Sequence, residues 1–314
     1  MHRMQLLVLG GTGFVGRHLV PRLAAAGHRI TVLSRNRDRH RELWIVPGVR
    51  VVNGDPYQSA SLVPWLKGAD AAINLVGILN ERGRSGQGFK RAHVDLTACL
   101  IRACREAGVR RILQMSALNA GRGQSHYLKT RGEAENLVRD SGLAWTIFRP
   151  SVIFGRGDGL FYRFAKLLRL FPVLPLARAH ARFQPVFVGD VAAAFAAALE
   201  NPSAIGQTYE LGGPEIMTLA EIVRYTARQL GLRRLILPLP DWIGRLQGLI
   251  FDFVPGKPFS SDNFKSLLLD SVVEEDGLAR LGIPKTPVGA VMPALLKGLC
   301  RQSELDRFRR YRLS

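Results

Sequence analysis

A glycine-rich turn near the start of the chain follows a short apolar run and precedes a helical pattern. It reads Gly10-Gly11-Thr12-Gly13-Phe14-Val15-Gly16, with a glycine at every third position from Gly10. Glycine permits the tight turn, lets backbone N–H groups approach a pyrophosphate, and lets the helix pack close to the strand. A strand before it and a helix after it make the motif specific. We therefore predict a dinucleotide site contacted by Gly10, Thr12, Gly13, Phe14, Val15 and Gly16.

Short apolar runs alternate with helical patterns through the first half of the chain. The runs cover 6–9, 30–33, 49–52, 71–76, 111–115 and 144–148, and helical patterns cover 92–107 and 129–139. Such alternation predicts parallel strands joined by crossover helices. The predicted fold class is α/β, with a doubly wound, mostly parallel Rossmann-type sheet. Residues 1–150 are its dinucleotide-binding core.

The second half of the chain is less regular, because proline and glycine interrupt it repeatedly. Residues 186–188 predict a further strand and residues 190–199 an alanine-rich helix. Thr218 and Glu221 form a capping box before a helix over 222–230. We predict that residues 151–300 complete the sheet and add a small mixed lobe that closes over a substrate. Residues 301–314 form a basic tail.

The end of the second predicted strand bears on which dinucleotide is bound. A site for NAD usually has an acidic residue there, which accepts a hydrogen bond from the ribose 2′-hydroxyl. This chain has Ser34-Arg35-Asn36-Arg37 instead. A guanidinium suits a 2′-phosphate, so NADP(H) is favoured. NAD(H) is the alternative if Arg35 and Arg37 are solvated loop charges. Asp55, after the third strand, is a candidate either for binding the adenine amino group or for capping a turn.

Further motifs along residues 4–298 resemble those of the atypical or extended short-chain dehydrogenases/reductases. They are Asn74-Leu75-Val76-Gly77, Gln114-Met115-Ser116-Ala117-Leu118, Tyr127-x-x-x-Arg131 and Phe148-Arg149-Pro150-Ser151. Within that superfamily, Ser116–Ala120, Arg149–Gly155 and Val254–Pro258 resemble the group related to the nucleotide-binding accessory subunit of respiratory complex I. The resemblance implies that Leu75, Val76, Gly77, Met115, Pro150 and Ser151 also contact the cofactor.

The resemblance also implies a catalytic group, formed by Tyr127, Arg131 and Ser116. In active members a tyrosine exchanges a proton with the substrate oxygen, and a lysine four residues later lowers the cost of the phenolate. Here Arg131 occupies that lysine position, and Lys129 points elsewhere on the helix. The serine that usually orients the substrate aligns nearer Leu118 than Ser116. Ser116 is therefore expected against the cofactor ribose, and Tyr127 is either an acid/base or a structural residue.

Composition excludes several other classes of protein. The net charge is +19, yet there is no helix-turn-helix, zinc-finger or RNA-binding pattern, so nucleic acid is not an expected partner. Three cysteines without a CxxC motif predict free thiols in a reducing compartment, and no metal site is expected. No apolar run reaches the length of a spanning helix or resembles a signal peptide. The predicted location is cytoplasmic, with peripheral attachment to the inner face of the membrane as an option.

Two amphipathic segments, 160–171 and 241–253, carry apolar residues at helical spacing. Basic residues line the opposite side of the first segment. Both faces either pack into the small lobe or contact an anionic membrane surface, a lipidic substrate or a partner subunit. Two functions follow. The first is an NADP(H)-dependent oxidoreductase acting on an apolar, quinone-related substrate. The second is a non-catalytic NADP(H)-binding accessory or assembly factor of a membrane-associated respiratory or quinone-synthesis complex.

Overall fold

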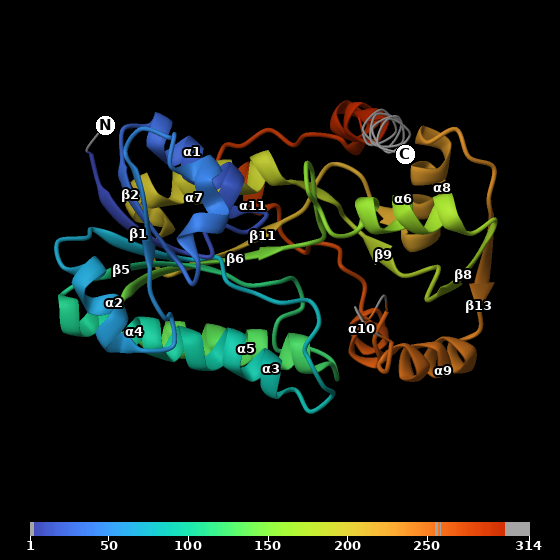
Figure 1. Ribbon diagram of the computed structural model, residues 1–314, viewed down its shortest axis with the longest axis horizontal. Helices are drawn as coiled ribbons and strands as arrows, with labels where there is room; N and C mark the ends of the chain where they lie inside the picture. The colour runs from blue at the N-terminus through green and yellow to red at the C-terminus, as the bar shows by residue number, and fades with distance from the viewer. Residues whose placement is uncertain (1–2, 255–256, 258, 299–314) are drawn as a thin grey trace, which may run out of the picture.

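A computed structural model describes residues 3–254, 257 and 259–298. Within these residues, seven parallel strands form one sheet in the order β11-β6-β5-β4-β1-β2-β3 (Figure 1). They are β1 (Gln5–Leu9), β2 (Arg29–Ser34), β3 (Val49–Asn53), β4 (Ala71–Asn74), β5 (Arg111–Met115), β6 (Ala144–Pro150) and β11 (Gln207–Leu211). The six predicted apolar runs are β1 to β6, so the predicted doubly wound α/β fold is confirmed.

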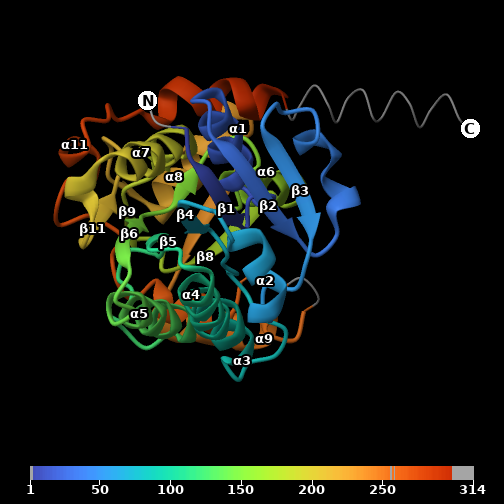
Figure 2. The same ribbon diagram turned by 90° about the vertical axis from the view of Figure 1, so that its left-hand side faces the viewer.

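Helices cover both faces of the sheet, as Figure 2 shows. On one face lie α1 (Gly16–Ala25) and α7 (Val188–Glu200), and on the other lie α2 (Ser59–Leu66), α4 (Leu96–Ala107) and α5 (His126–Arg139). Successive side chains of a strand point to opposite faces. Leu6 and Val8 of β1 accordingly pack under α1 and α7, whereas Leu7 and Leu9 pack under α2 and α4. A strand buried on both faces must be apolar throughout, which explains the uninterrupted runs.

The helix over 92–107 differs in detail from its prediction. A short helix α3 (Gln87–Lys90) and a π-helical turn (Arg91–Asp95) precede α4. Gly108, with φ of 78°, ends α4 in the left-handed conformation that favours glycine. The helix predicted over 129–139 begins three residues earlier, at His126, because Ser125 caps its N-terminus.

The second half supplies the strand that completes the sheet. This is β11, which pairs with β6 and was not predicted from the sequence. The predicted strand at 186–188 is the short β10 (Val186–Phe187), which pairs with β7 (Ile153–Phe154) outside the large sheet. The alanine-rich helix is confirmed as α7. The capping box of Thr218 and Glu221 is also confirmed, at the start of α8 (Leu219–Gln229).

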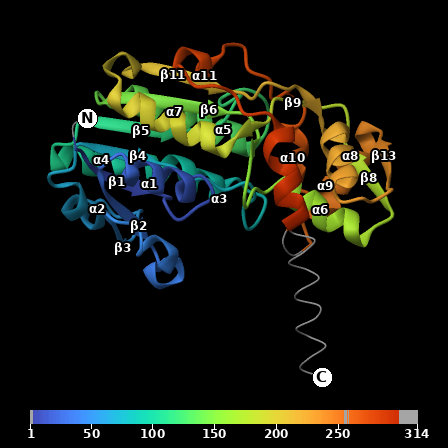
Figure 3. The same cartoon turned by 90° about the horizontal axis from the view of Figure 1, so that it is seen from above.

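A lobe lies beyond the carboxyl ends of the strands, as Figures 1 and 3 show. It contains α6 (Phe161–Leu170), β8 (Val173–Ala177), α8, β13 (Leu235–Leu239), α9 (Asp241–Phe251) and α10 (Ser261–Ser266). The remaining short elements of the chain, in the lobe or elsewhere, are β9 (Arg182–Phe183), β12 (Met217–Thr218), α11 (Gly277–Arg280), and 3-10 turns at Arg37–Leu43 and Pro202–Ala204. The predicted basic tail, residues 301–314, lies outside the described residues, as do residues 255, 256 and 258 of the motif Val254–Pro258.

The two amphipathic segments meet different environments. Phe161, Phe164 and Leu168 of α6 are buried in the lobe, so the apolar face of this helix packs into the protein. In α9 the buried residues are Gly244 and Gly248; Trp242, Leu246, Leu249 and Ile250 are exposed, whereas Phe251 lines the cavity described below. In the part of the chain that the structure describes, no helix has both the length and the apolar character needed to cross a membrane.

Candidate cofactor and active site

A large cavity joins the carboxyl ends of the strands to the lobe. Its volume is about 1450 Å³. One end is formed by the glycine turn after β1 and by residues after β2, β4, β5 and β6, where open α/β sheets bind ligands. The other end is apolar and lies in the lobe, where it is lined by Leu160, Phe164, Leu167, Leu174, Leu176 and Phe251.

The glycine turn has the geometry that a pyrophosphate requires. Gly10 has φ of 75°, and its carbonyl accepts a hydrogen bond of 2.9 Å from the Gly13 N–H. A Cβ on Gly10 would lie 3.0 Å from the Val76 nitrogen, and a Cβ on Gly16 would collide with the Gly11 backbone. The predicted residues Gly10, Thr12, Gly13, Phe14, Val15 and Gly16 all line the cavity. Glycine at positions 10 and 16 therefore lets the turn pack against the end of β4 and against its own backbone.

The segment after β2 contributes Ser34 and Arg35 to the cavity wall, but not Arg37. Arg35 is exposed and has no ion pair with any described residue. The Arg37 guanidinium lies 3.6 Å from an Asp38 oxygen and 5.5 Å from the centre of the Trp44 ring. Arg39, which belongs to none of the sequence motifs, lines the cavity with Arg35.

Asp55 caps a turn, one of the two roles considered for it. Its carboxylate accepts hydrogen bonds from the Tyr57 backbone at 3.0 Å and from the Gln58 side chain at 3.2 Å. Asp55 does not line the cavity, whereas its neighbours Pro56 and Tyr57 do. Its contact with adenine stays a prediction that this geometry does not favour.

Arg131 lies buried at the centre of the site. One guanidinium nitrogen donates to the carbonyls of Met115 at 2.9 Å and Val76 at 3.3 Å, so it links the ends of β4 and β5. A Cβ on Gly77 would collide with this guanidinium, which gives a physical reason for glycine there. Leu75, Val76, Gly77 and Met115 all line the cavity. The Arg131 Nε has no hydrogen-bond partner among the described residues.

Tyr127 lines the cavity one helical turn before Arg131. The Arg131 guanidinium carbon lies 5.6 Å from the centre of its ring. The His93 ring packs edge-on against the Tyr127 ring at 5.5 Å. Burial, together with the positive charge of Arg131, lowers the pKa of His93 to about 2, so His93 is neutral. It shares a hydrogen bond of 2.9 Å with Thr130, and its Nε2 accepts one from the Ile78 N–H. His93 therefore supports Tyr127 sterically.

The N-terminus of α5, which carries Tyr127, is held from the lobe. The two carboxylate oxygens of Asp262 in α10 accept hydrogen bonds from the backbone N–H groups of His126 at 2.6 Å and Tyr127 at 3.1 Å. Asp262 is buried. An acceptor at a helix N-terminus satisfies otherwise unpaired N–H groups and matches the helix dipole. Asp262 carries no sequence signal for this role, because it lies 135 residues from Tyr127 in the chain.

Ser116 and Ser151 differ in how their hydroxyl groups are bonded. The Ser116 hydroxyl is buried against the cavity and has no hydrogen-bond partner among the described residues. That of Ser151 donates to the Ser271 carbonyl at 2.6 Å and accepts from the Gln184 N–H at 3.2 Å. Pro150 and Leu118 line the cavity beside them. Ser116 therefore keeps a free hydroxyl for a ligand, whereas Ser151 binds the lobe.

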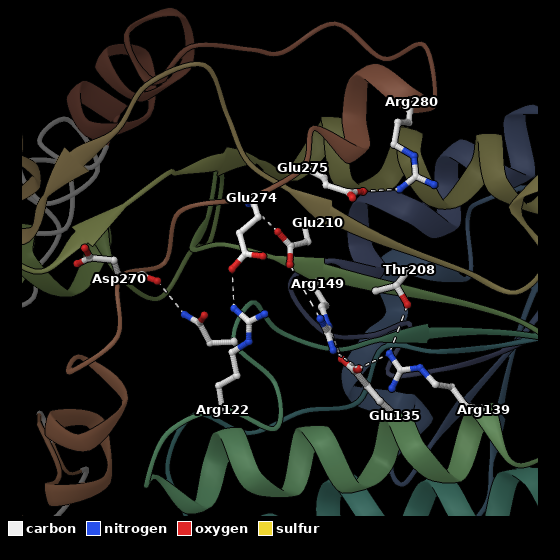
Figure 4. Close-up of polar contacts among 11 residues, drawn as sticks. Arg122, Glu135, Arg139, Arg149, Thr208, Glu210, Asp270, Glu274, Glu275 and Arg280 are labelled. Carbon is white, nitrogen blue, oxygen red and sulfur yellow. Dashed lines mark hydrogen bonds and ion pairs between the residues drawn. The ribbon is translucent and has the colours of Figure 1, made fainter.

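A charged network fixes α5 on the sheet. Figure 4 shows Arg149 of β6 donating two hydrogen bonds to Glu135, at 2.9 and 2.6 Å, while Arg139 donates to the same carboxylate at 2.8 Å. The hydrogen bond with Glu135 raises the pKa of Arg149. Glu135 follows Tyr127 and Arg131 at steps of four, so these residues share one face of α5. The network thus orients the face that carries Tyr127.

The residues of the site fit a nicotinamide dinucleotide. The glycine turn at the N-terminus of α1 lines the cavity, and Ser116 and Arg131 each have a buried polar atom without a partner among the described residues. Buried polar atoms are nearly always paired, so these atoms indicate a ligand or an ordered water. No group of three or more His, Cys, Asp or Glu side chains gathers as metal ligands within 3–254, 257 and 259–298.

Comparison with known proteins agrees with this geometry. Residues 10–166 match the NAD(P)H-binding family model. The chain is 32% identical to the mitochondrial NADH dehydrogenase [ubiquinone] 1 alpha subcomplex subunit 9 of Arabidopsis thaliana, over 86% of this chain and 71% of the relative. It is 33% identical to the ceramide reductase of Caulobacter vibrioides, over 74% of this chain and 73% of the relative.

A solved structure shares the fold over most of the chain. A double mutant of dTDP-glucose 4,6-dehydratase from Streptomyces venezuelae, determined with NAD bound, superposes with a TM-score of 0.75. The match has 22% sequence identity and covers 94% of this chain and 96% of the dehydratase. At that identity the likeness concerns the fold.

Proposed function

The chain belongs to the NAD(P)H-binding Rossmann-type family and is homologous to subunit 9 of the NADH dehydrogenase alpha subcomplex, and on this premise we propose that it is an NADP(H)-dependent oxidoreductase. Its proposed substrate is an apolar carbonyl compound related to quinones. The observation that carries the proposal is the position of Tyr127. This residue lines one continuous cavity that joins the glycine turn to the apolar lobe.

The proposed reaction divides the work between the cofactor and the chain. When bound, NADPH would supply a hydride to the carbonyl carbon of the substrate and would be oxidised to NADP⁺. The Tyr127 hydroxyl donates a proton to the carbonyl oxygen, so the product is an alcohol and solvent restores the proton. Arg131 places its guanidinium carbon 5.6 Å from the centre of the Tyr127 ring, on the same face of α5. Ser116 offers its unpaired hydroxyl to the cofactor ribose.

Arg35 and Arg39 support the preference for NADP(H). Both line the cavity next to the end of β2, where the adenine ribose of a Rossmann cofactor lies. Neither has an ion pair with a described carboxylate, so a 2′-phosphate would not compete with an internal partner. Guanidinium groups bind phosphate through charge-assisted hydrogen bonds.

The lobe end of the cavity supports an apolar substrate. Its wall is built from leucine and phenylalanine side chains of α6, β8 and α9, so a hydrocarbon group there would be removed from water. The similar ceramide reductase is named for a lipid. An apolar substrate is concentrated in membranes, and we propose that the protein acts in the cytoplasm, peripherally at the inner face of the membrane.

A second function is favoured by Arg131. Its guanidinium is bonded to two backbone carbonyls, and the planar fork does not replace the ammonium of a lysine. A chain of this kind would bind NADP(H) without turnover and stabilise a membrane-associated respiratory or quinone-synthesis assembly. The similarity to a subunit of mitochondrial NADH dehydrogenase favours the same alternative.

Replacing Tyr127 by phenylalanine separates the two functions. NADPH oxidation is measured with panels of soluble quinones and ketones, and NADPH affinity is measured in parallel by fluorescence titration. We expect Tyr127→Phe to lower turnover by about 100-fold or more, because general acid catalysis contributes about that much. The affinity for NADPH should change little. Tyr225→Phe is the control, since the Tyr225 hydroxyl is buried away from the cavity and has no partner among the described residues.

Two results would count against the reductase. If the wild-type protein binds NADPH but reduces no compound in either panel, the accessory function replaces it. If Tyr127→Phe retains full turnover, the reductase stands but Tyr127 is not its acid.

A further inference from the structure

The outer face of α9 is apolar and exposed. Trp242, Leu246, Leu249, Ile250 and Phe253 recur at helical spacing, and Trp242 and Phe253 are 70% and 75% exposed. We call these five residues the α9 face. The inner side of the helix packs through Gly244, whose Cβ would lie 2.9 Å from the Ala177 Cβ, and Gly248, whose Cβ would lie 3.1 Å from the Ser261 Cα. This close packing through glycines turns the large side chains outward.

The acidic side chains around the α9 face are paired with arginines. Asp241 forms an ion pair with Arg178 at 3.0 Å. Asp252 is buried, accepts a hydrogen bond of 2.6 Å from Ser261 and lies 3.3 Å from Arg84. The Arg84 guanidinium carbon in turn lies 5.2 Å from the centre of the Phe253 ring.

Exposed Arg245 lies on the same helix as the α9 face. The Arg245 guanidinium carbon lies 5.9 Å from the centre of the Phe264 ring, so within the α9 face only Phe253 has a described guanidinium contact, and both carboxylates of the segment 241–253 are already paired.

We propose that the α9 face docks this protein on the surface of an anionic lipid bilayer. A helix that lies in a membrane interface buries an apolar face and holds basic side chains at the level of the headgroups. Here the apolar residues supply the buried area, and Arg245, which has no ion pair with a described carboxylate, supplies a positive charge that complements anionic headgroups, whereas the charge of Arg84 is met by Asp252. The α6 helix, which the sequence also marks as amphipathic, buries Phe161, Phe164 and Leu168 in the lobe and exposes Leu170 and Phe171 only at its C-terminal end.

Docking through α9 would bring the cavity to the bilayer. Gln247, Phe251 and Val254 line the cavity from the same segment. Val254 and Leu79 line it and are also exposed, so they mark an apolar part of its rim. A substrate dissolved in the bilayer then reaches the lobe without crossing water, a consequence that rests on the proposed function.

The test is sedimentation of the full-length protein with phosphatidylcholine vesicles, prepared with and without phosphatidylglycerol. Ile250→Glu places a charge in the α9 face, where Ile250 is 55% exposed. Ile205→Glu makes the same change on the sheet half, where Ile205 is 45% exposed. We expect the wild type and Ile205→Glu to sediment with vesicles that contain phosphatidylglycerol. Ile250→Glu should lower the partition coefficient by about tenfold or more, because burying one isoleucine is worth at least that factor.

Other outcomes identify other occupants of the face. Equal binding by the two variants, or no binding by the wild type, would overturn the proposal. A wild type that is dimeric by light scattering and becomes monomeric with Ile250→Glu would show that a second copy covers the α9 face instead. NADPH affinity and the reduction of a soluble substrate are measured on the same samples, so failure of docking is distinguished from failure of the reductase.

Discussion

At the scale of single residues, the site is defined by how far each polar side chain is already engaged. Arg37, Asp55 and Ser151 have their hydrogen bonds or charges met within the protein. Arg35 and Ser116 do not, among the residues that the structure describes. Sequence motifs assign all five to the cofactor because a motif reports position along the chain. Only the packed structure shows which of them remain available to a ligand.

Arg35 provides the sharpest prediction at this scale. We expect Arg35→Gln to weaken NADPH binding by about tenfold, the usual value of a hydrogen bond to a charged group, and to leave NADH binding unchanged. Arg37→Gln is the matched control, because Arg37 faces Asp38 and Trp44 and does not line the cavity. Calorimetric titration with each cofactor gives the two affinities. Equal losses for NADPH and NADH would refute a 2′-phosphate contact.

At the scale of elements, strands and helix ends could be predicted from the sequence wherever their cause is local. Buried parallel strands need apolar runs, and Gly10 and Gly108 occupy left-handed conformations that few other residues tolerate. The strand β11 could not be predicted, because it pairs with β6, which lies far from it in the sequence, and that pairing has no local sequence signal. Asp262 was missed for the same reason: its role depends on α10 meeting α5.

Asp262 predicts a coupling between the lobe and the catalytic helix. Asp262→Ala removes both acceptors from the N-terminus of α5, so we expect it to lower the free energy of unfolding by about 1–2 kcal/mol. It should also lower kcat more than it weakens NADPH binding, because Tyr127 is the first residue to lose its position. Asp276→Ala is the control, since Asp276 caps α11 away from the cavity. If kcat falls equally in the two variants, Asp262 has only a structural role.

Asp158 gives α6 a pH-dependent N-terminus. Burial raises the pKa of Asp158 from 3.8 to about 6, although backbone N–H groups of Gly155, Leu160 and Tyr162 oppose the shift. Between these two pKa values, the Asp158 carboxyl of the folded protein therefore keeps a proton that the unfolded chain has already released. Its contribution to stability is complete below the unfolded pKa, falls as the pH rises to about 6, and is constant above.

The measurement is urea unfolding of the wild type and Asp158→Asn between about pH 4 and about pH 7. The variant cannot titrate at this position. We expect its free energy of unfolding, relative to the wild type, to rise by roughly 2–3 kcal/mol across this range. A difference that stays constant with pH would show that Asp158 is not protonated in the folded protein.

At the scale of the whole molecule, the cavity is shared between the sheet and the lobe. The glycine turn, Arg35 and Tyr127 line it from elements of the sheet, whereas α6, β8 and α9 supply the apolar end. Sequence motifs predicted the glycine turn, Arg35 and Tyr127. For the lobe, the sequence predicted only that its segments are apolar. The continuity of the cavity, and the outward orientation of the α9 face, depend on how the lobe packs and have no local signature.

The central claim is that one cavity binds NADP(H) with its nicotinamide end at Tyr127. It is tested most directly by a crystal structure of the protein grown with NADPH and NADH in competition. We predict density for NADPH, with the pyrophosphate at Gly10–Gly16, the 2′-phosphate on Arg35 and the nicotinamide facing Tyr127. A preference for NADH would contradict the role of Arg35. A nicotinamide ring directed away from Tyr127 would contradict the proposed reaction.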